Sequence, residues 1–523
     1  MIALLFVSVP GVVAAQTEGT GTGDGAGVST AGTDSDADAT TASEAGSAPE
    51  EGAAAAGESA DSADGDGGAS DAPKKSVNEQ ILDLLRESGQ ITEERYGELK
   101  AQEQAERASY EQQSAALKYE LDGLHFVHPG TKIASVILNG RIHADYWGFP
   151  CTNDGAAELE GERPQNRFGF RRVRFGVKGD ILEYMPYKIE MEFADPDDFE
   201  WRDVHIGFKT IPYVQTLLVG NQKRPYGLDH LNSSRYNTFM ERPMFIDAFN
   251  DDARRLGIEA YGVSDSEMFN WRYGVFNGDK VQDSDALYTS NNMQGEIAGR
   301  FASTLWYPEE REGKDYLHLG VSGTVAFPDG STDPRAANTA RFRARPEARS
   351  IERWVNTDFI DTAETCELLG FEAVFNKGPF SLTGEWQNVW TQRDVGSSLH
   401  FWGAYGQVAY WLTGDYSPWS RKSGTLGRTK PIQGLYSIKD DEWGWGAWQV
   451  ALRYSYSDMS NGDILGGVGQ NITLSLNWWF NPNSRLQFNY IHGEIDESQT
   501  LIDAGGDQVA RYDIVGARFM VDF

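Results

Sequence analysis

Apolar and polar positions alternate along the chain from Ile133 to its last residue. In the stretch ASVILNGRIHADYW, the apolar Val136, Leu138 and Ile142 interleave with the polar Asn139 and Arg141. The same period of two returns in FRRVRFGVKG, YKIEMEF and NITLSLNWWF. A strand has this period because successive side chains point to opposite faces of its sheet. The pattern therefore predicts strands with one apolar face and one polar face.

About sixteen such strands can be counted, starting near residues 133, 167, 187, 202, 214, 253, 270, 295, 315, 365, 380, 400, 447, 469, 485 and 510. Odd-numbered links are mostly long, such as 148–166, 222–252, 327–364 and 494–509. Several even-numbered links are tight, and the long link 413–446 is an exception that we expect on the periplasmic side. Alternation alone would also suit a soluble β-sandwich, but short turns on one side and long loops on the other are typical of outer-membrane barrels. We therefore expect an all-β fold, a closed antiparallel transmembrane β-barrel over residues 131–523.

The last strand carries an aromatic residue at its end, and Phe523, Val521 and Phe519 share one apolar face. In a closed barrel the final strand pairs with the first, so a chain can end flush with its last strand without leaving an open edge. An aromatic terminus on the lipid-facing side also resembles the recognition signal of the outer-membrane barrel assembly machinery. We expect these three residues to serve as that signal.

Three segments of different composition precede the barrel. Residues 1–15 have a short apolar core followed by small residues, which is typical of a signal peptide. Residues 16–73 are rich in Gly, Ala, Ser, Asp and Glu and predict a disordered acidic tether. Residues 76–122 show apolar residues at helical spacing and predict a helical or coiled-coil segment on the periplasmic side, which could self-associate or act as a spacer.

Composition excludes a bundle of transmembrane helices, because the mean hydropathy is -0.49 and the chain lacks the necessary runs of about 20 apolar residues. The 57 glycines and 63 aromatic residues suit a barrel with aromatic girdles. Enzyme chemistry is not indicated, since the eight histidines are scattered and no nucleophile elbow or phosphate-binding glycine loop occurs. We expect no catalytic residue, metal, cofactor or nucleic-acid partner.

One long stretch resembles a known family. LLVGNQKRPYGLDHLNSSRYNTFMERPMFIDAFNDDARRLGIEAYG, residues 217–262, is similar to the phosphate-selective porin (O and P) family, as are YWLTGDY, WGAWQVALRYSYSD and LNWWFNPNSRLQFNYIH. The chain resembles the planctomycete-like version of that family, which has an N-terminal helical extension. The resemblance implies a trimeric channel in the outer membrane, surrounded by its lipid and passing small anions such as phosphate. It also implies that loop 222–252 folds into the lumen and narrows it.

Basic residues are the candidate pore residues, because fixed cations in a narrow passage replace part of the hydration of an anion. In and beside the inward loop they are Lys223, Arg224, Arg235, Arg242, Arg254 and Arg255. On the polar face of the strands they are Arg141, Arg172, Arg174, Lys178, Lys188, Lys209, Arg453 and Arg518. The alternative for the strand residues is a salt ladder with inward carboxylates, for example Lys178 opposite Glu190.

The overall charge leaves the selectivity open. The net charge is -32, and the 13 acids of residues 16–71 leave about -19 for the rest of the chain. A general non-selective porin therefore remains an alternative, as does a structural anchor that holds the envelope through the N-terminal helices. Two cysteines, Cys151 and Cys366, both fall at the external rim by the strand count, where a disulfide would require a long loop to cross the barrel mouth.

Overall fold

The computed structural model describes residues 77–113, 116–120, 123–127, 135–196, 199–250, 253–278, 280–281, 294–328, 338–437 and 441–523. The expected signal peptide and acidic tether lie outside these residues. Of the two compact units into which the chain divides, the one described here comprises Lys75–Phe523. No helix among the described residues has the length and apolar character needed to cross a membrane.

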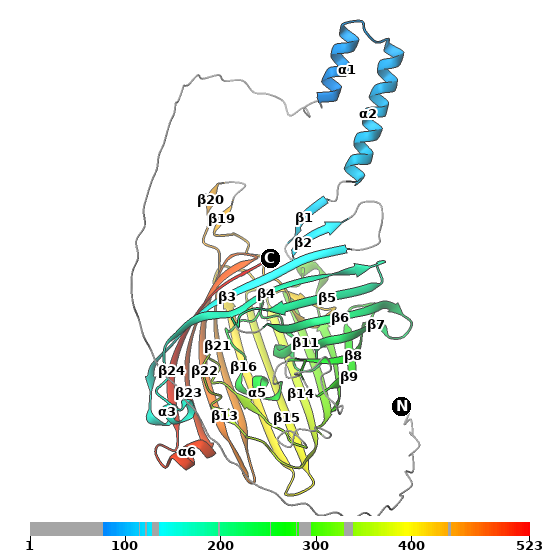
Figure 1. Ribbon diagram of the computed structural model, residues 1–523. Helices are drawn as coiled ribbons and strands as arrows, with labels where there is room; N and C mark the ends of the chain where they lie inside the picture. The colour runs from blue at the N-terminus through cyan, green and yellow to red at the C-terminus, as the bar shows by residue number, and fades with distance from the viewer. Residues whose placement is uncertain are drawn as a thin grey trace, which may run out of the picture. The chain divides into compact units, whose positions relative to one another are not determined.

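Sixteen antiparallel strands close into one barrel, as the alternation predicted (Figure 1). They are β3 (Ser135–Thr152), β4 (Arg167–Ile181), β5 (Met185–Glu192), β6 (Glu200–Ile211), β7 (Gln215–Lys223), β8 (Arg254–Val263), β9 (Phe269–Asn277), β10 (Gly295–Trp306), β11 (Asp315–Phe327), β14 (Ala363–Lys377), β15 (Phe380–Arg393), β16 (Leu399–Trp411), β21 (Ala447–Asn461), β22 (Ile464–Asn481), β23 (Ser484–Ser498) and β24 (Ala510–Asp522). All strand starts but one lie within two residues of the predicted position. The exception is β22, which begins at Ile464 rather than near 469, because the glycine-rich GGVGQ continues the strand instead of forming a turn.

Short elements lie in the links between these strands. They are α3 (Asp154–Glu160), α4 (Leu228–Leu231), α5 (Met244–Phe249), α6 (Gln499–Ala504), a 3-10 turn (Glu309–Arg311), and the strand pairs β12 (Arg343–Ala344) with β13 (Val355–Asn356), β17 (Trp419–Ser420) with β18 (Thr425–Leu426), and β19 (Tyr436–Ser437) with β20 (Glu442–Trp443). We call the end of the barrel that carries the start of β3 and the end of β24 the terminus end. The opposite end is called the loop end.

Barrel closure is made by β24 against β3. Arg518 pairs with Asp145 and Asp522 pairs with Arg141 in this register. Beyond the last paired strand residue, the backbone of Phe523 exchanges two hydrogen bonds with Gly140, of 2.9 and 3.2 Å. The side chains of Phe519, Val521 and Phe523 point outward and are exposed, as predicted for the lipid-facing side.

The segment before the barrel is partly helical and partly strand. Helices α1 (Val77–Glu87) and α2 (Glu93–Gln113) show that the predicted helical segment is helical over much of its length, and the Tyr96 hydroxyl of α2 donates a 2.5 Å hydrogen bond to Asp83 of α1. The prediction that the helical segment runs to residue 122 was wrong. Residues 116–120 form β1 (Ala116–Glu120), which pairs with β2 (Gly123–Val127), because this stretch changes to the alternation of a strand. β2 pairs with residues 135–138 of β3, directly beyond the point where Phe523 ends.

The apolar core lies inside the barrel. Helix α5 contributes Met244, Phe245 and Ile246, which pack in one cluster with Trp354 of the β11–β14 link and with Ile491 of β23. Figure 1 shows α5 among the strands of the barrel. The lumen is therefore divided into separate polar and aromatic spaces around a packed core, rather than being one open channel.

The long link between β16 and β21 joins strands at the terminus end, as expected, but part of it enters the barrel. The Trp419 ring stacks on Tyr316 with 5.2 Å between centroids, and its indole N–H donates to Thr304. Arg300 of β10 donates to the carbonyl oxygens of Ser423 and Gly424. We call residues 412–428 the turn insert. The alternation pattern did not indicate it, because the segment is irregular and held by side-chain contacts.

The close approach of Gly140 to the chain end generates a prediction about closure. A Cβ at Gly140 would lie 2.5 Å from the ring of Phe523 and 2.7 Å from the Arg174 carbonyl oxygen. We expect G140A to destabilise the folded barrel by about 1–3 kcal/mol, measured as a lower midpoint of urea unfolding in detergent. G406A in β16 is the matched control, because its Cβ would meet nothing within 4 Å. Equal midpoints for the two variants would contradict this account of the seam.

Candidate functional site

The loop between β7 and β8 crosses the lumen, as the family resemblance implied. Its residues 224–250, which we call the inner loop, are bound to strands on several sides of the barrel. The backbone N–H groups of Leu228 and Asp229 each donate a 2.7 Å bond to the carboxylate of Glu385 in β15. Farther on, Phe245 N–H donates to Ser457 in β21, and Asn477 in β22 donates to the carbonyl of Thr238. These hydrogen bonds hold the inner loop across the lumen, so that it divides the interior of the barrel.

A cavity of about 320 Å³ lies between this loop and the wall formed by β3 to β8. We call it the basic cavity, because eight basic side chains line it and only two acidic ones do. The basic residues are Arg141, Arg172, Arg174, Lys188, Lys223, Arg235, Arg242 and Arg254, and the acidic ones are Glu190 and Asp203. Eight of the fourteen cations singled out in the sequence are thus brought together.

The two carboxylates of the basic cavity are shared among several cations. Glu190 lies 3.0 Å from Arg141, 3.4 Å from Arg174 and 3.5 Å from Lys188. Asp203 lies 2.6 Å from Arg254 and also pairs with Lys188. Basic residues of these strands therefore do pair with inward carboxylates, as the salt-ladder alternative supposed.

The register of that ladder differs from the predicted one. Glu190 stands opposite Gly176, and Lys178 stands opposite Lys188. The predicted Lys178–Glu190 pair was wrong because β5 begins at Met185, two residues earlier than counted.

Arg172 differs from its neighbours in the basic cavity. Among the described residues, no carboxylate lies within salt-bridge distance of Arg172, and its nearest polar contact is His143 Nδ1 at 3.5 Å. Both side chains are buried, and Arg172 Nε and His143 Nε2 have no hydrogen-bond partner in the described part of the chain. A buried donor without an acceptor is costly, so these groups favour a water molecule or an anion at this point.

Lys223 at the end of β7 and two cations of the inner loop also hold that loop in place. Lys223 Nζ donates to three carbonyl oxygens of residues 230–232 at 2.7–3.1 Å. Arg235 lies 3.0 Å from Asp522, and Arg242 lies 3.0 Å from Asp229. Burial raises the pKa of Asp229, although the guanidinium of Arg242 opposes this shift.

Six of the predicted cations lie elsewhere. Arg224 and Arg255 line a different cavity, where Arg224 is 2.7 Å from Glu296. Arg453 pairs with Glu347 of the β11–β14 link, and Arg518 lies 2.6 Å from Asp145. Lys209 is 2.5 Å from Asp180 near a turn at the terminus end, and Lys178 does not line the basic cavity. The alternation along each strand correctly predicted which of its side chains face the lumen. It did not predict how far along the barrel axis each of these side chains lies.

A second basic space follows the first along the same wall, toward the loop end. This loop-end cavity measures about 380 Å³ and is lined by Arg167, Arg171, Arg345 and Arg349, with Asp145 as its acidic group. None of these four arginines was singled out in the sequence. Arg171 turns inward because a β-bulge interrupts the register between β3 and β4. The arginine-rich stretch ARFRARPEARS was the available signal for Arg345 and Arg349.

Glu241 of the inner loop stands where the two basic spaces approach each other. Its carboxylate lies 2.8 Å from Arg171 and 2.7 Å from Arg518. Burial alone would raise the pKa of Glu241, but the guanidinium groups of Arg171 and Arg518 outweigh burial and hold that pKa well below its usual range. Glu241 therefore stays ionised and neutralises cations that would otherwise face an anion.

Cys151 and Cys366 do not form a disulfide in the structure, and both thiols are free. Cys151 stands at the exposed end of β3, opposite Asp513 of β24. Cys366 lies on β14, seven strands from β3 by the shorter way around the barrel, where it is 3.6 Å from the Thr391 hydroxyl. No loop brings the two together, so the crossing that a bridge required does not occur.

Comparisons with known proteins found a family, a relative and several solved structures to which this chain is similar. The family model described as phosphate-selective porin O and P matches residues 136–523. An uncharacterized protein of Caulobacter vibrioides is 31% identical over 367 residues, which cover 68% of each chain. The solved anion-selective porin from Comamonas acidovorans is 15% identical, with a TM-score of 0.43 over 75% of this chain and 100% of its own. The trimer form of OmpT from Vibrio cholerae is 12% identical, with a TM-score of 0.44 over 75% of this chain and 100% of its own.

The position of Glu241 generates a prediction. E241Q removes one negative charge between Arg171 and Arg518, so it should raise the preference of the lumen for chloride over potassium by about fivefold, equivalent to about 1 kcal/mol. The measurement is the reversal potential of bilayer currents in a KCl gradient. E158Q on the exposed face of α3 is the matched control, since it makes the same change outside the lumen. A shift in E158Q as large as that in E241Q would contradict a local role.

Proposed function

Because the chain belongs to the phosphate-selective porin O and P family, an outer-membrane family, we propose that it is a porin that passes small anions by diffusion. The observation that carries the proposal is the basic cavity, in which eight cations face two carboxylates. An excess of fixed positive charge within one Debye length of a permeating ion favours anions even when the whole chain is acidic.

The proposed path runs along the β3–β4 wall. An anion would enter the loop-end cavity beside Arg345 and Arg349, pass Arg171, and reach Arg172 in the basic cavity. Arg171 and Arg172 are consecutive, so the two spaces are linked by neighbouring guanidinium groups. The inner loop and the turn insert fill much of the remaining lumen. For this reason we place the path only along the β3–β4 wall.

Small oxyanions such as phosphate suit the proposal best. A guanidinium offers two parallel N–H donors to such an anion, and arginines outnumber lysines six to two in the basic cavity. The lining includes few apolar side chains, so a solute with a large apolar part would gain little there. A general non-selective porin is favoured by a different observation, that Glu190 and Asp203 already engage four of the eight cations.

The other features proposed for the protein follow from the same membership. We propose a homotrimer in outer-membrane lipid, with the terminus end of the barrel and the N-terminal segment on the periplasmic side. A trimer would be seen as a threefold mass of the detergent-solubilised protein in light scattering.

The decisive experiment is bilayer conductance with substitution of the unpaired cation. R172Q should lower the chloride preference by about fivefold, because it removes a positive charge that has no carboxylate within salt-bridge distance among the described residues. K209Q is the control, since it removes one charge at a turn outside the basic cavity. Phosphate should compete with chloride current in the unsubstituted protein and less in R172Q.

Each outcome of that experiment distinguishes the candidate functions. An unchanged reversal potential in R172Q would favour a non-selective porin and reject the anion path. A barrel without conductance would indicate a structural anchor of the envelope.

The chain end yields a separate prediction about assembly. Deleting Phe523 removes both the ring and the backbone pair with Gly140, whereas F523A removes only the ring. If the barrel assembly machinery reads the aromatic side chain, both variants should reach lower levels in the outer membrane. F523A should nevertheless unfold in detergent at about the same urea concentration as the unsubstituted protein. Normal membrane levels of F523A would contradict recognition of the ring.

A further inference from the structure

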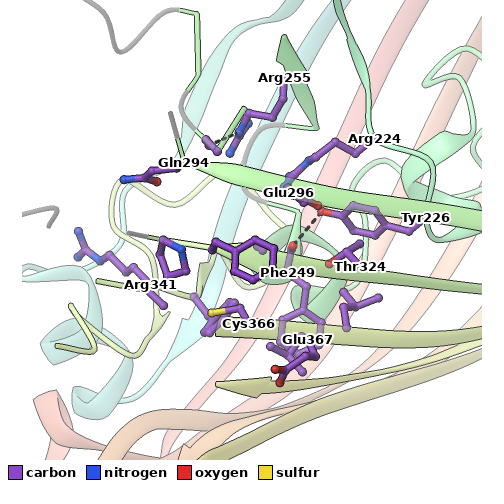
Figure 2. A pocket seen from close by; sticks show the side chains of 18 of the residues that line it. Arg224, Tyr226, Phe249, Arg255, Gln294, Glu296, Thr324, Arg341, Cys366 and Glu367 are labelled. Atoms are coloured by element: carbon purple, nitrogen blue, oxygen red, sulfur yellow. Dashed lines mark hydrogen bonds and ion pairs between the residues drawn. The ribbon is translucent and has the colours of Figure 1, made fainter. Parts of the chain in front are cut away.

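A third cavity differs in chemistry from the two basic spaces. It has a volume of about 200 Å³ and lies at the loop end, near the starts of β8, β10 and β14 and the end of β11. Figure 2 shows its lining, which includes Tyr226, Phe249, Phe342, Leu368, Glu296 and Cys366. We call it the aromatic cavity. The rings of Phe249 and Phe342 meet edge to face with 5.8 Å between centroids.

The volume and the lining fit a single aromatic ring. A dry protein cavity of about 150 Å³ lined by apolar side chains accepts a benzene-sized molecule. The aromatic cavity is somewhat larger and is bounded by Phe249, Phe342, Leu368 and Val389. Burial of a ring against these side chains would be favourable through its apolar area and through contacts between ring edges and faces.

The charged groups of the aromatic cavity are engaged with other protein groups. Arg255 donates to the carbonyl of Gly278 at 2.6 Å, and Arg341 donates to Asn356 at 3.0 Å. Arg224 donates to Glu296 at 2.7 Å and to the carbonyl of Asn250 at 3.2 Å. An anion would have to compete with these acceptors, so the cavity does not repeat the chemistry of the basic spaces.

Glu296 brings to the lining a buried carboxylate oxygen that the described residues leave without a hydrogen bond. Glu296 is 3% exposed, and its Oε2 accepts the bond from Arg224. Its Oε1 is buried and has no hydrogen-bond partner among the described residues. An oxygen of an ionised carboxylate can only accept a hydrogen bond, so a ligand with a hydrogen-bond donor at this position would satisfy it. A cationic donor would lie beside the Arg224 guanidinium, and repulsion disfavours it.

From these observations we propose that the aromatic cavity is a second solute site, which binds a small neutral aromatic compound bearing a hydroxyl group. The ring packs between Phe249, Phe342 and Leu368, and the hydroxyl donates to Glu296 Oε1. The site is lined by residues of β8, β10, β11 and β14 and not by the β3–β4 wall of the proposed anion path, so reversal potentials do not test it.

Cys366 provides a reporter for the test, because its thiol lines the same cavity. In the full-length C151S protein, Cys366 is the remaining thiol, and its rate of modification by methyl methanethiosulfonate can be followed by mass spectrometry. We expect phenol to slow this reaction in a saturable manner. Anisole has the same ring but no hydroxyl hydrogen, so its half-protecting concentration should be about tenfold higher.

Two controls separate binding from general effects of the compounds. In C366S the exposed Cys151 is the remaining thiol, and phenol should leave its rate unchanged. In C151S with F342A, protection of Cys366 by phenol should weaken at least fivefold. The comparison of phenol with anisole requires no change within the cavity, so it stands even if F342A does not fold.

Three outcomes would overturn the proposal. Absence of protection by phenol at its solubility limit would show that no ring binds. Equal protection by anisole would show that Glu296 does not receive a hydroxyl group. A Cys366 that does not react with the reagent even at a pH high enough to ionise a buried thiol would show that small solutes do not enter the cavity.

Discussion

The pairing of β24 with β3 is the interaction on which the rest of the structure depends. In a membrane, every backbone N–H and C=O group of a spanning strand needs a partner, and only a closed barrel supplies one to each strand. Closure fixes an inside and an outside for every strand, and therefore decides that Arg141, Arg172 and Arg174 face the lumen while Ile142, Val173 and Phe175 do not. A shift of one residue at the seam would exchange the two faces.

Closure alone would leave an open lumen, and the inner loop and turn insert determine what remains of it. Both segments are held by strand side chains that form hydrogen bonds with their backbone groups. Glu385 accepts from the first N–H groups of α4, and Arg300 donates to a carbonyl oxygen of the turn insert. Apolar residues of α5 then pack against the strands and exclude water from the middle of the barrel. The polar spaces that remain differ in chemistry because different strands line them.

Much of the fold could be predicted from the sequence, because the alternation of apolar and polar residues is local. It can be recognised in each strand from the residues of that strand alone. The inward parity of Arg453 and Arg518 was predicted for the same reason. What could not be predicted depends on register and on distant contacts. The predicted Lys178–Glu190 pair failed through a shift of two residues. Two consecutive arginines between Phe170 and Val173 mark an interruption of the alternation, but they do not by themselves say that a bulge turns Arg171 inward. The convergence of Arg345 and Arg349 with β4 depends on the path of a long link that has no period of its own.

The bulge at Arg171 also alters the distance over which an ion must move. A regular strand presents one inward side chain every second residue, which is about 6.6 Å at the usual rise. By turning two consecutive guanidinium groups inward, β4 shortens the interval between successive points of attraction along the wall. Conduction requires that a bound ion leave each site as readily as it arrives, and closely spaced sites lower the barrier between them. On the proposed anion path, a single extra residue in one strand would thus set the spacing of the basic groups that an ion meets, as well as the shape of the wall.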